Sequence, residues 1–297
     1  MDGSSVTDVD SGASSKLVAP VHGVHEWSGH TESGTGWQVH RGDAAVTLAL
    51  MEESRFQAVV TSPPYYWQRD YGVEGQIGLE KTIKEYVDNI CAVMNSVRRV
   101  LRKDGLLFLN LGDTYYSAKG QPKGDDKKNK ARRFGLRAVD GPGLGVPRKT
   151  AIGIPWRVAL AMIDDGWTLR SPIIWERANA LPEPTSKDRP WRSYEYVFMF
   201  AKSPKYHFDR AELGEEEDVW RIATRSGASS GSHAAAFPIS LAEKCIRCAT
   251  TKSDEVLDPF AGTGSTLVAA TKLGRRAVGI DLKLEYCQLS VKNLSKI

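Results

Sequence analysis

One five-residue stretch combines a hydroxyl group, two prolines and an aromatic ring directly after an apolar run. Residues 56–60 have the composition of a short buried strand, and Thr61, Ser62, Pro63, Pro64 and Tyr65 follow it. Two consecutive prolines fix φ and cannot donate to a sheet, so the strand must end there in a stiff turn. This turn lies at a strand's carboxyl end, which is where open α/β sheets bind ligands. A rigid turn with an aromatic plug is the alternative that these residues alone leave open.

A second stretch with residues suited to ligand binding lies near the end of the sequence. Residues 255–258 have the pattern of a strand, which turns through Phe260, Gly262 and Gly264 into an apolar helix. The glycines let the backbone approach a ligand closely, and the N-terminus of the following helix offers free N–H groups. Asp281 ends the next expected strand, where it is placed to accept both ribose hydroxyls of an adenosine.

This second turn departs from the dinucleotide fingerprint. The third glycine of that fingerprint would fall at Leu267, and the turn begins with Asp-Pro-Phe. A pyrophosphate site requires the third close glycine contact, whereas a nucleoside with an amino-acid tail does not. We therefore expect S-adenosyl-L-methionine rather than NAD, with Phe260 along the cofactor and residues 263–266 near its methionine end.

Residues 61–65 and 258–265 together resemble the amino-methylating DNA methyltransferases that act on cytosine N4 or adenine N6. The catalytic motif precedes the cofactor motif, as in the permuted beta group of that family. Supporting stretches match in the expected order, one just ahead of the catalytic turn at residues 40–43 and the others between the two motifs at residues 174–179, 188–190, 193–197, 218–220 and 233–238. The resemblance therefore covers about residues 37–294. It implies an α/β, Rossmann-like methyltransferase fold with circularly permuted motifs.

The resemblance also implies the chemistry of the first turn. Ser62 and the backbone carbonyl of Pro63 would accept hydrogen bonds from the exocyclic amino group of the target base. That nitrogen is a poor nucleophile because its lone pair is delocalised into the ring. Two acceptors that pull its N–H bonds out of the ring plane restore a directional lone pair, which attacks the sulfonium methyl group in line. Tyr65 would stack on the base, which must be flipped out of the duplex; Pro64 completes the expected catalytic set.

The residue before Pro-Pro bears on the choice of base. In this family Asp or Asn there usually marks adenine enzymes, and Ser usually marks N4-cytosine enzymes. Ser62 therefore favours methylation of cytosine N4 in double-stranded DNA, within a restriction-modification system. Adenine-N6 methylation is the alternative. A non-catalytic DNA-binding module is a third interpretation, but it would not need both an intact turn and an intact cofactor loop.

The expected cofactor pocket draws on both halves of the sequence. Asp43, Phe237 and Pro238 join it through the resemblance, although Asp43 also fits a plain helix N-cap. The full expected set is Asp43, Thr61, Phe237, Pro238, Asp258, Pro259, Phe260, Gly262, Gly264, Ser265, Thr266 and Asp281. No metal is expected, because Cys245 and Cys248 form a lone C-x-x-C within an expected helix and lack a second pair of zinc ligands.

Basic residues concentrate between the expected strands. Residues 117–150 are rich in Lys, Arg and Gly, which is typical of a flexible solvated loop and also of a mobile basic arm that closes on DNA. We expect target recognition in about residues 177–192 and 205–232. The expected DNA-binding residues are Arg69, Lys127, Lys128, Arg132, Arg133, Arg177, Asn179, Lys187, Arg189 and Arg192. A net charge of +4 is compatible with a polyanionic partner.

Alternating strands and helices must position these groups. The patterns predict strands at residues 37–39, 56–60, 106–111, 167–175, 194–201, 255–258 and 275–280. They predict helices at residues 44–51, 82–101, 154–165, 237–248, 267–273 and 284–294, with Gly105 as the C-cap of the second. Such alternation favours a mostly parallel sheet with helices on both faces.

Length and composition set the remaining expectations. The 297 residues suffice for one large α/β domain with insertions, which we expect over residues 37–297 after a disordered tail at residues 1–36. The four scattered cysteines do not suggest a disulfide framework, and neither a membrane-spanning run nor a secretory signal is present. We expect a cytoplasmic, nucleoid-associated monomer or weak dimer, and leave open a cognate restriction endonuclease that acts separately.

Overall fold

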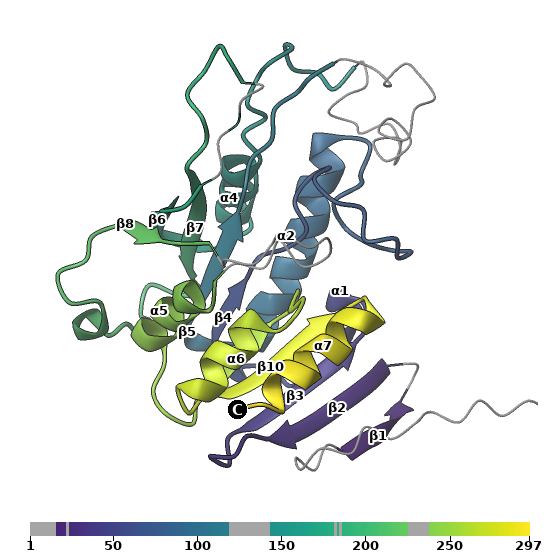
Figure 1. Cartoon of the computed structure of the whole chain (residues 1–297), viewed down its shortest axis with the longest axis vertical. Coiled ribbons are helices and arrows are strands. Elements are labelled where there is room, and N and C mark those ends of the chain that lie inside the picture. Colours follow the sequence, from purple (N-terminus) through teal and green to yellow (C-terminus); the bar gives the residue numbers. More distant parts are fainter. Residues whose placement is uncertain (1–15, 22–23, 119–142, 181–182, 184–185, 225–237) are drawn as a thin grey trace, which may run out of the picture.

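A computed structural model describes the chain except for residues 1–15, 22–23, 119–142, 181–182, 184–185 and 225–237 (Figure 1). Its strands are β1 (Lys16–Val21), β2 (Val24–His30), β3 (Gly36–Arg41), β4 (Phe56–Thr61), β5 (Leu101–Leu111), β6 (Thr168–Arg177), β7 (Tyr194–Ala201), β8 (Val219–Ile222), β9 (Glu255–Asp258) and β10 (Arg276–Asp281). Its helices are α1 (Ala44–Ala49), α2 (Ile83–Val100), α4 (Ile154–Asp164), α5 (Ile239–Ala249), α6 (Ser265–Lys272) and α7 (Leu284–Leu294), with a 3₁₀ turn, η1, at Arg210–Leu213.

The strands of the described part form one sheet in the order β1-β2-β3-β10-β9-β4-β5-β7-β6-β8. Its centre, from β3 to β5, is parallel, while β1, β2 and β7 pair antiparallel with their neighbours and β8 runs parallel to β6. The predicted α/β class with a largely parallel sheet is confirmed. Because β4, β9 and β10 are adjacent and parallel, their carboxyl ends meet at one edge, although β4 and β9 lie about 200 residues apart in the sequence.

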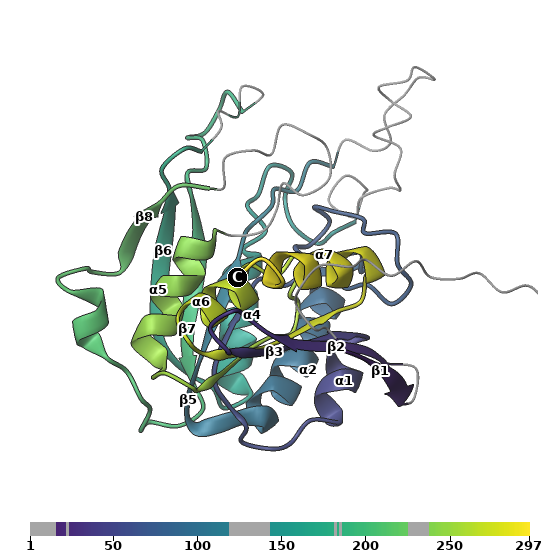
Figure 2. The ribbon, with the colours of Figure 1, turned by 60° about the horizontal axis from the view of Figure 1, so that its bottom comes forward.

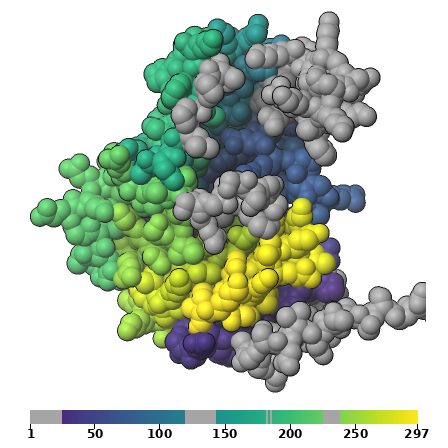
Figure 3. Space-filling view, viewed as in Figure 1, coloured from purple at the N-terminus to yellow at the C-terminus, as the bar shows by residue number. Residues whose placement is uncertain are grey.

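Two helical layers cover the sheet (Figure 2). Helices α1, α2 and α4 pack on one face, and α5, α6 and α7 pack on the other. Side chains of β4 alternate between the two faces of the sheet. Val59 belongs to the core under the first helical layer, and Ala58 and Val60 belong to the core under the second, so the whole strand is buried. In the space-filling view, α7 (yellow) forms the lower part of one face, and teal segments of the middle of the chain form its upper part (Figure 3). No helix among the described residues is both long and apolar enough to cross a membrane.

Helix α2 carries the strongest local signals. Thr82 and Glu85 form a reciprocal capping box at its start, and its buried face presents an apolar stripe to the sheet. The predicted C-cap at Gly105 is wrong, because α2 ends at Val100 and β5 begins at once with Leu101. Gly105 lies within β5, where a Cβ would come within 2.9 Å of the Gln57 backbone oxygen. The glycine therefore serves close strand packing instead of ending a helix.

The prediction of a disordered tail through residue 36 is also wrong for the described residues 16–21 and 24–36. Residues 24–30 form β2, which pairs antiparallel with β3 and in turn pairs with β1. Gly29 lies against the Trp37 ring so closely that a Cβ would come within 2.5 Å of its Cζ2 atom. The polar composition of these residues does not indicate a strand. The strand forms because it pairs with β3 of the sheet, and its side chains from His25 to Ser28 are only half-buried, so they need not be apolar. Residues 1–15 lie outside the described part.

Candidate cofactor pocket and catalytic turn

A pocket opens at the edge where β4, β9 and β10 end. Its empty volume, counted out to the open mouth, is about 1060 Å³, which is ample for a nucleoside with an amino-acid tail. The first turn, the glycine turn, the end of β10 and a loop after the first turn all contribute to its wall. The lining residues are Gly42, Asp43, Ala44, Ser62, Pro64, Arg69, Tyr71, Val73, Gly75, Gln76, Ile77, Asp258, Pro259, Phe260, Ala261, Gly262, Thr263, Ser265, Asp281, Leu282, Lys283 and Tyr286.

Asp258 joins the two halves of the site. Its Oδ1 accepts hydrogen bonds from Thr61 Oγ1 at 2.6 Å and from the Phe260 backbone N–H at 3.0 Å, and its Oδ2 accepts from Thr266 Oγ1 at 2.7 Å. Burial raises the pKa of this carboxyl to about 6, although the same hydrogen bonds favour the ionised form. Thr61 and Thr266 thus lie behind the pocket wall and fix the end of β4 to the start of α6.

Asp281 shapes the part of the pocket where a ribose is expected. Its Oδ2 accepts from the Gly262 N–H at 2.9 Å, and its Oδ1 accepts from the Lys283 N–H at 2.8 Å. These bonds hold the carboxylate in one orientation, and each oxygen keeps a second lone pair for a ligand hydroxyl. Burial raises the pKa of Asp281 to about 6. Asp43 lies beside this region and caps α1, since its Oδ1 accepts from Val46 N–H at 3.0 Å.

The glycine turn has the backbone geometry that its sequence predicts. Gly262 and Gly264 have φ values of 53° and 86°, in the left-handed region that favours glycine. A Cβ at Gly264 would also come within 2.9 Å of Ser290 Oγ on α7. This close approach places the N-terminus of α6 at the pocket, where Ser265 is buried in the wall.

The loop after the first turn forms a wall that the motifs did not predict. Residues 69–77 contribute Arg69, Tyr71, Gln76 and three apolar or glycine positions to the pocket, and Lys283 Nζ donates to the Tyr71 backbone oxygen at 3.1 Å. Arg69, expected at DNA, therefore lies at the cofactor pocket. The aromatic and basic composition of this loop was the available signal, but it fits base stacking equally well.

Two orphaned polar atoms indicate that a polar ligand fits this pocket. Ser265 Oγ and Gln76 Nε2 are buried and lack a hydrogen-bond partner within the described part of the chain. The Gln76 amide is oriented, since its Oε1 accepts from the Tyr71 N–H at 2.9 Å. A ligand that accepts hydrogen bonds would satisfy them, and buried polar groups are rarely left unsatisfied. The amino-acid end of S-adenosyl-L-methionine has such acceptors, and Asp281 suits its ribose.

The expected catalytic turn, residues 61–65, lies at the pocket's edge with its Tyr65 hydroxyl anchored beneath it. Tyr65 OH donates to Glu195 Oε2 at 2.6 Å and lies 2.9 Å from Asn110 Oδ1, and Ser62 Oγ is 3.2 Å from the same hydroxyl. Burial and the adjacent Glu195 raise the pKa of Tyr65 well above its usual range. Gly112 lies under the ring, where a Cβ would come within 2.6 Å of Tyr65 Cε2.

The two prolines are held from the helical layer. The Pro64 carbonyl accepts from Tyr86 OH on α2 at 2.9 Å, while Pro63 is buried. Burial raises the pKa of Tyr86, so this phenol keeps the proton that it donates. A carbonyl that the sequence left unassigned is therefore satisfied by a residue of α2, which fixes the turn relative to the sheet.

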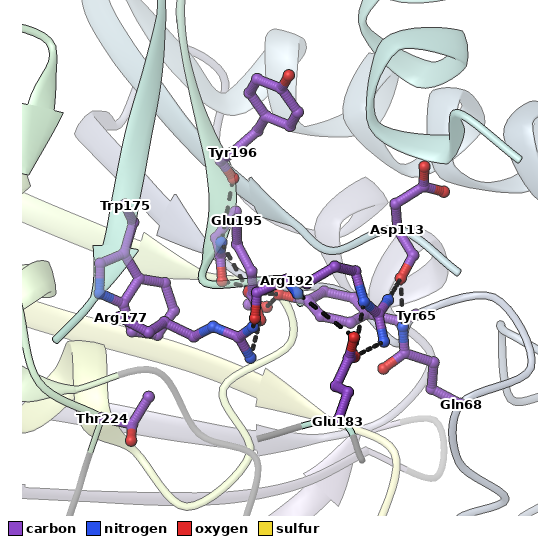
Figure 4. A network of polar contacts seen from close by, with 12 residues as sticks. Tyr65, Gln68, Asp113, Trp175, Arg177, Glu183, Arg192, Glu195, Tyr196 and Thr224 are labelled. Carbon is purple, nitrogen blue, oxygen red and sulfur yellow. Dashed lines mark hydrogen bonds and ion pairs between the residues drawn. The ribbon is translucent and has the colours of Figure 1, made fainter. Parts of the chain in front are cut away.

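Arg177 and Arg192, two of the arginines expected at DNA, are joined in an internal network (Figure 4). Arg192 donates to both Glu183 and the Asp113 backbone oxygen, at 2.8 Å and 2.6 Å. Arg177 lies 3.7 Å from Glu195 and donates to the Arg192 backbone oxygen at 2.7 Å. Hydrogen bonds from Arg192 and Arg189 lower the pKa of Glu183 to about 2, against the opposing effect of its burial. The network anchors the segment after β6 to the loop that follows β5.

The remaining expected residues divide by location. Arg189 pairs with Glu183 and covers the Tyr115 ring, Asn179 exchanges hydrogen bonds with Thr224, and Lys187 is exposed. Pro238 is buried at the start of α5 and is not among the described lining residues of the pocket. Lys127, Lys128, Arg132, Arg133 and Phe237 lie outside the described residues. Cys245 and Cys248 are buried on α5, as expected for core cysteines. The described residues contain no group of three or more His, Cys, Asp or Glu that could hold a metal.

Comparison with known proteins identifies the family of this chain. The DNA methylase family model N6_N4_Mtase matches residues 56–292. The Type II methyltransferase M.Cfr9I of Citrobacter freundii is 41% identical over 268 residues, which cover 87% of this chain and 88% of that protein. M.SmaI of Serratia marcescens is 40% identical over 264 residues, which cover 85% and 89%.

Two solved structures share the architecture. The cytosine-N4-specific PvuII DNA methyltransferase aligns with a TM-score of 0.67 at 24% identity, over 86% of each chain, which speaks for the fold alone. A DNA modification methylase of Thermus thermophilus, named as putative and complexed with S-adenosyl-L-methionine, aligns with a TM-score of 0.61 at 26% identity, over 90% of this chain and 95% of that one. The family match, the joined turns and the pocket agree, and this chain belongs to the S-adenosyl-L-methionine-dependent DNA methyltransferases of the N6/N4 amino-methylating family.

Proposed function

We propose that this protein methylates the N4 amino group of a flipped cytosine in double-stranded DNA, as the modification enzyme of a restriction-modification system. The observation that carries the choice of base is Ser62, a neutral hydroxyl in place of Asp or Asn, at the edge of the cofactor pocket. The relatives named Type II methyltransferases support the restriction-modification setting.

The residues of the turn prepare the nucleophile. S-adenosyl-L-methionine supplies an activated methyl group on its sulfonium. Ser62 Oγ and the Pro63 carbonyl accept hydrogen bonds from the two N–H bonds of the cytosine amino group and draw them out of the ring plane. The freed lone pair points toward the pocket that Asp281 and Phe260 line. Tyr65 stacks on the flipped base, and the absence of a side chain at Gly112 makes room for its ring.

Target recognition is proposed for the segments beside this turn. Lys187 is exposed for contact with phosphate, and Trp191 has 53% of its surface exposed within the same segment. Arg177, Arg189 and Arg192 hold this segment in place through Glu183 and Glu195, and we propose that their remaining N–H groups face DNA. The proposal includes the basic residues at 127–133, which lie outside the described part.

Mass spectrometry of nucleosides tests this proposal. Unmethylated DNA is incubated with the purified protein and isotopically labelled S-adenosyl-L-methionine, and then digested to nucleosides. We expect label in N4-methylcytosine, with sequencing of the modified DNA to locate the site. Label in N6-methyladenine would preserve the fold and the amino-methylation chemistry, but would overturn the assignment of the base from Ser62.

A further inference from the structure

Three polar groups surround the phenol oxygen of the catalytic turn. Glu195 Oε2 lies 2.6 Å away, Asn110 Oδ1 lies 2.9 Å away and Ser62 Oγ lies 3.2 Å away. They come from β7, β5 and the turn itself, so three separate elements meet at one hydroxyl. The ring of Tyr65 has an expected role in stacking, but stacking does not require this hydroxyl.

The donors and acceptors in this cluster can be assigned. Asn110 Nδ2 donates to the Tyr196 backbone oxygen at 3.0 Å, which fixes the amide so that its carbonyl faces Tyr65. Glu195 is paired with Arg177 at 3.7 Å, and its carboxylate can only accept. Burial and Glu195 raise the pKa of Tyr65 and so keep it protonated. The single phenol proton is therefore directed to Glu195 and Asn110. Toward Ser62 the phenol oxygen can act only as an acceptor, so Ser62 must be the donor.

This assignment determines what Ser62 offers to a substrate. A serine hydroxyl carries one proton and two lone pairs, and its proton rotates freely unless a partner holds it. When Ser62 donates to Tyr65, both lone pairs remain for an incoming amino group. Without that partner the Ser62 proton can point at the substrate, where it would oppose an N–H donor.

We propose that the Tyr65 hydroxyl, with its proton held by Glu195 and Asn110, is a positioning group that fixes the Ser62 hydroxyl as an acceptor for the target amino group. This inference rests on the proposed role of Ser62 in amino methylation, and it holds for cytosine or adenine. It assigns to Glu195 and Asn110 an effect on the reaction rate that they exert through Tyr65, without contact with the substrate.

A double-mutant cycle tests the inference. Tyr65→Phe removes the hydroxyl and keeps the stacking ring, and it is made in the parent enzyme and in Ser62→Ala. The single-turnover rate of methylation is measured with saturating labelled S-adenosyl-L-methionine, and cofactor affinity is measured by calorimetry. We expect Tyr65→Phe to slow the parent roughly tenfold at unchanged cofactor affinity, as for loss of one well-placed hydrogen bond. In Ser62→Ala, which has no hydroxyl to orient, we expect it to have no further effect.

A second variant and a matched control support the cycle. Glu195→Ala should slow the parent in the same way and should also lose its effect in Ser62→Ala. Glu176→Ala truncates a carboxylate on the neighbouring strand β6, where it pairs with Arg221, and should leave the rate unchanged.

Three outcomes would overturn the inference. The first is a Tyr65→Phe rate within twofold of the parent, and the second is an equal fold loss in both Ser62 backgrounds. The third is a fall in cofactor affinity that accounts for the slower rate. A parent enzyme that methylates no DNA would instead overturn the proposed function, and with it the inference that depends on it.

Discussion

Replacing Asp258 by Asn should make this protein more stable at neutral pH. The carboxylate is buried, with a pKa raised to about 6 by burial from an ordinary value of 3.8. Asn can keep the three contacts, because its Oδ1 can accept from Thr61 and Phe260 while its Nδ2 donates to Thr266. Thr266 Oγ1 then directs its own proton to the Val60 backbone oxygen, which already lies 3.1 Å away.

The magnitude follows from linkage between ionisation and folding. Because the folded-state pKa lies above the unfolded value, the folded state binds the proton more tightly, and the free energy of unfolding falls as pH rises from about 4 to about 6. The interval from 3.8 to about 6 corresponds to ~3 kcal/mol at 1.36 kcal/mol per pH unit. Well below pH 3.8 the carboxyl is protonated in both states, so this penalty is absent. Above pH 6 it is fully present.

Urea denaturation without cofactor measures the effect. The free energy of unfolding of the parent and of Asp258→Asn is determined at intervals from pH 4.5 to pH 8, and the difference is taken at each pH. Asp281 has a similarly raised pKa, but it is present in both proteins, so its contribution to the free energy of unfolding largely cancels in the difference. From pH 4.5 to pH 8 we expect the difference to change by about 2 kcal/mol in favour of Asn, with most of the change below pH 6 and a constant value above about pH 7.

Asp258→Ala is the control for lost hydrogen bonds. It removes the charge and all three acceptor contacts, so it should lack the gain that Asn shows at pH 7. A difference between parent and Asn that stays flat across this pH range would refute the assigned burial penalty. An Asn variant as unstable as the Ala variant at pH 7 would refute the proposed exchange of donor and acceptor at Thr266.

Three further predictions concern the pocket and the turn. Ser62→Ala should lower turnover strongly, by about a hundredfold, and leave cofactor affinity by calorimetry unchanged, because the hydroxyl is assigned to the amino group of the target base and not to the cofactor; an equal loss of both would refute the assigned role. Asp281 must be ionised to accept ribose hydroxyls, so cofactor affinity should fall up to tenfold per pH unit as pH drops below its pKa of about 6. Asp281→Asn should bind at least tenfold more weakly at pH 7 without that dependence, and a parent with pH-independent affinity between pH 5 and 7 would contradict the placement. Gly112→Ala should displace the Tyr65 ring, since a Cβ would lie 2.6 Å from it, and slow methylation at unchanged cofactor affinity; an unaffected rate would show that the ring can shift without cost.

The motifs could be predicted from sequence because each is a local backbone device. Pro63 and Pro64 end a strand wherever they occur, and Gly262 and Gly264 permit left-handed φ angles without reference to the rest of the fold. The apolar stripe of α2 and its capping box are local in the same sense. These features were sufficient for the α/β class, the order of most elements and the two turns of the site.

The errors arose where a distant partner decides the local structure. The strand at residues 24–30 has no apolar alternation of its own and exists because β3 offers a free edge. Gly105 follows an apolar helical pattern, as a C-cap glycine does, but it lies within a strand, close to Leu101 and Gln57. In both cases a neighbour outside the local window supplies the hydrogen bonds or the steric limit.

The sequence by itself determined the chemistry that each turn can perform: a hydroxyl and carbonyls at a stiff strand end, and a close backbone approach beside an aspartate. Only the tertiary structure decided which groups work together. Thr61 meets Asp258 across 197 residues, and Tyr65 meets Glu195 across 130. Parallel pairing of β4 with β9 and antiparallel pairing of β5 with β7 create these contacts, because strand register places residues side by side irrespective of their separation along the chain.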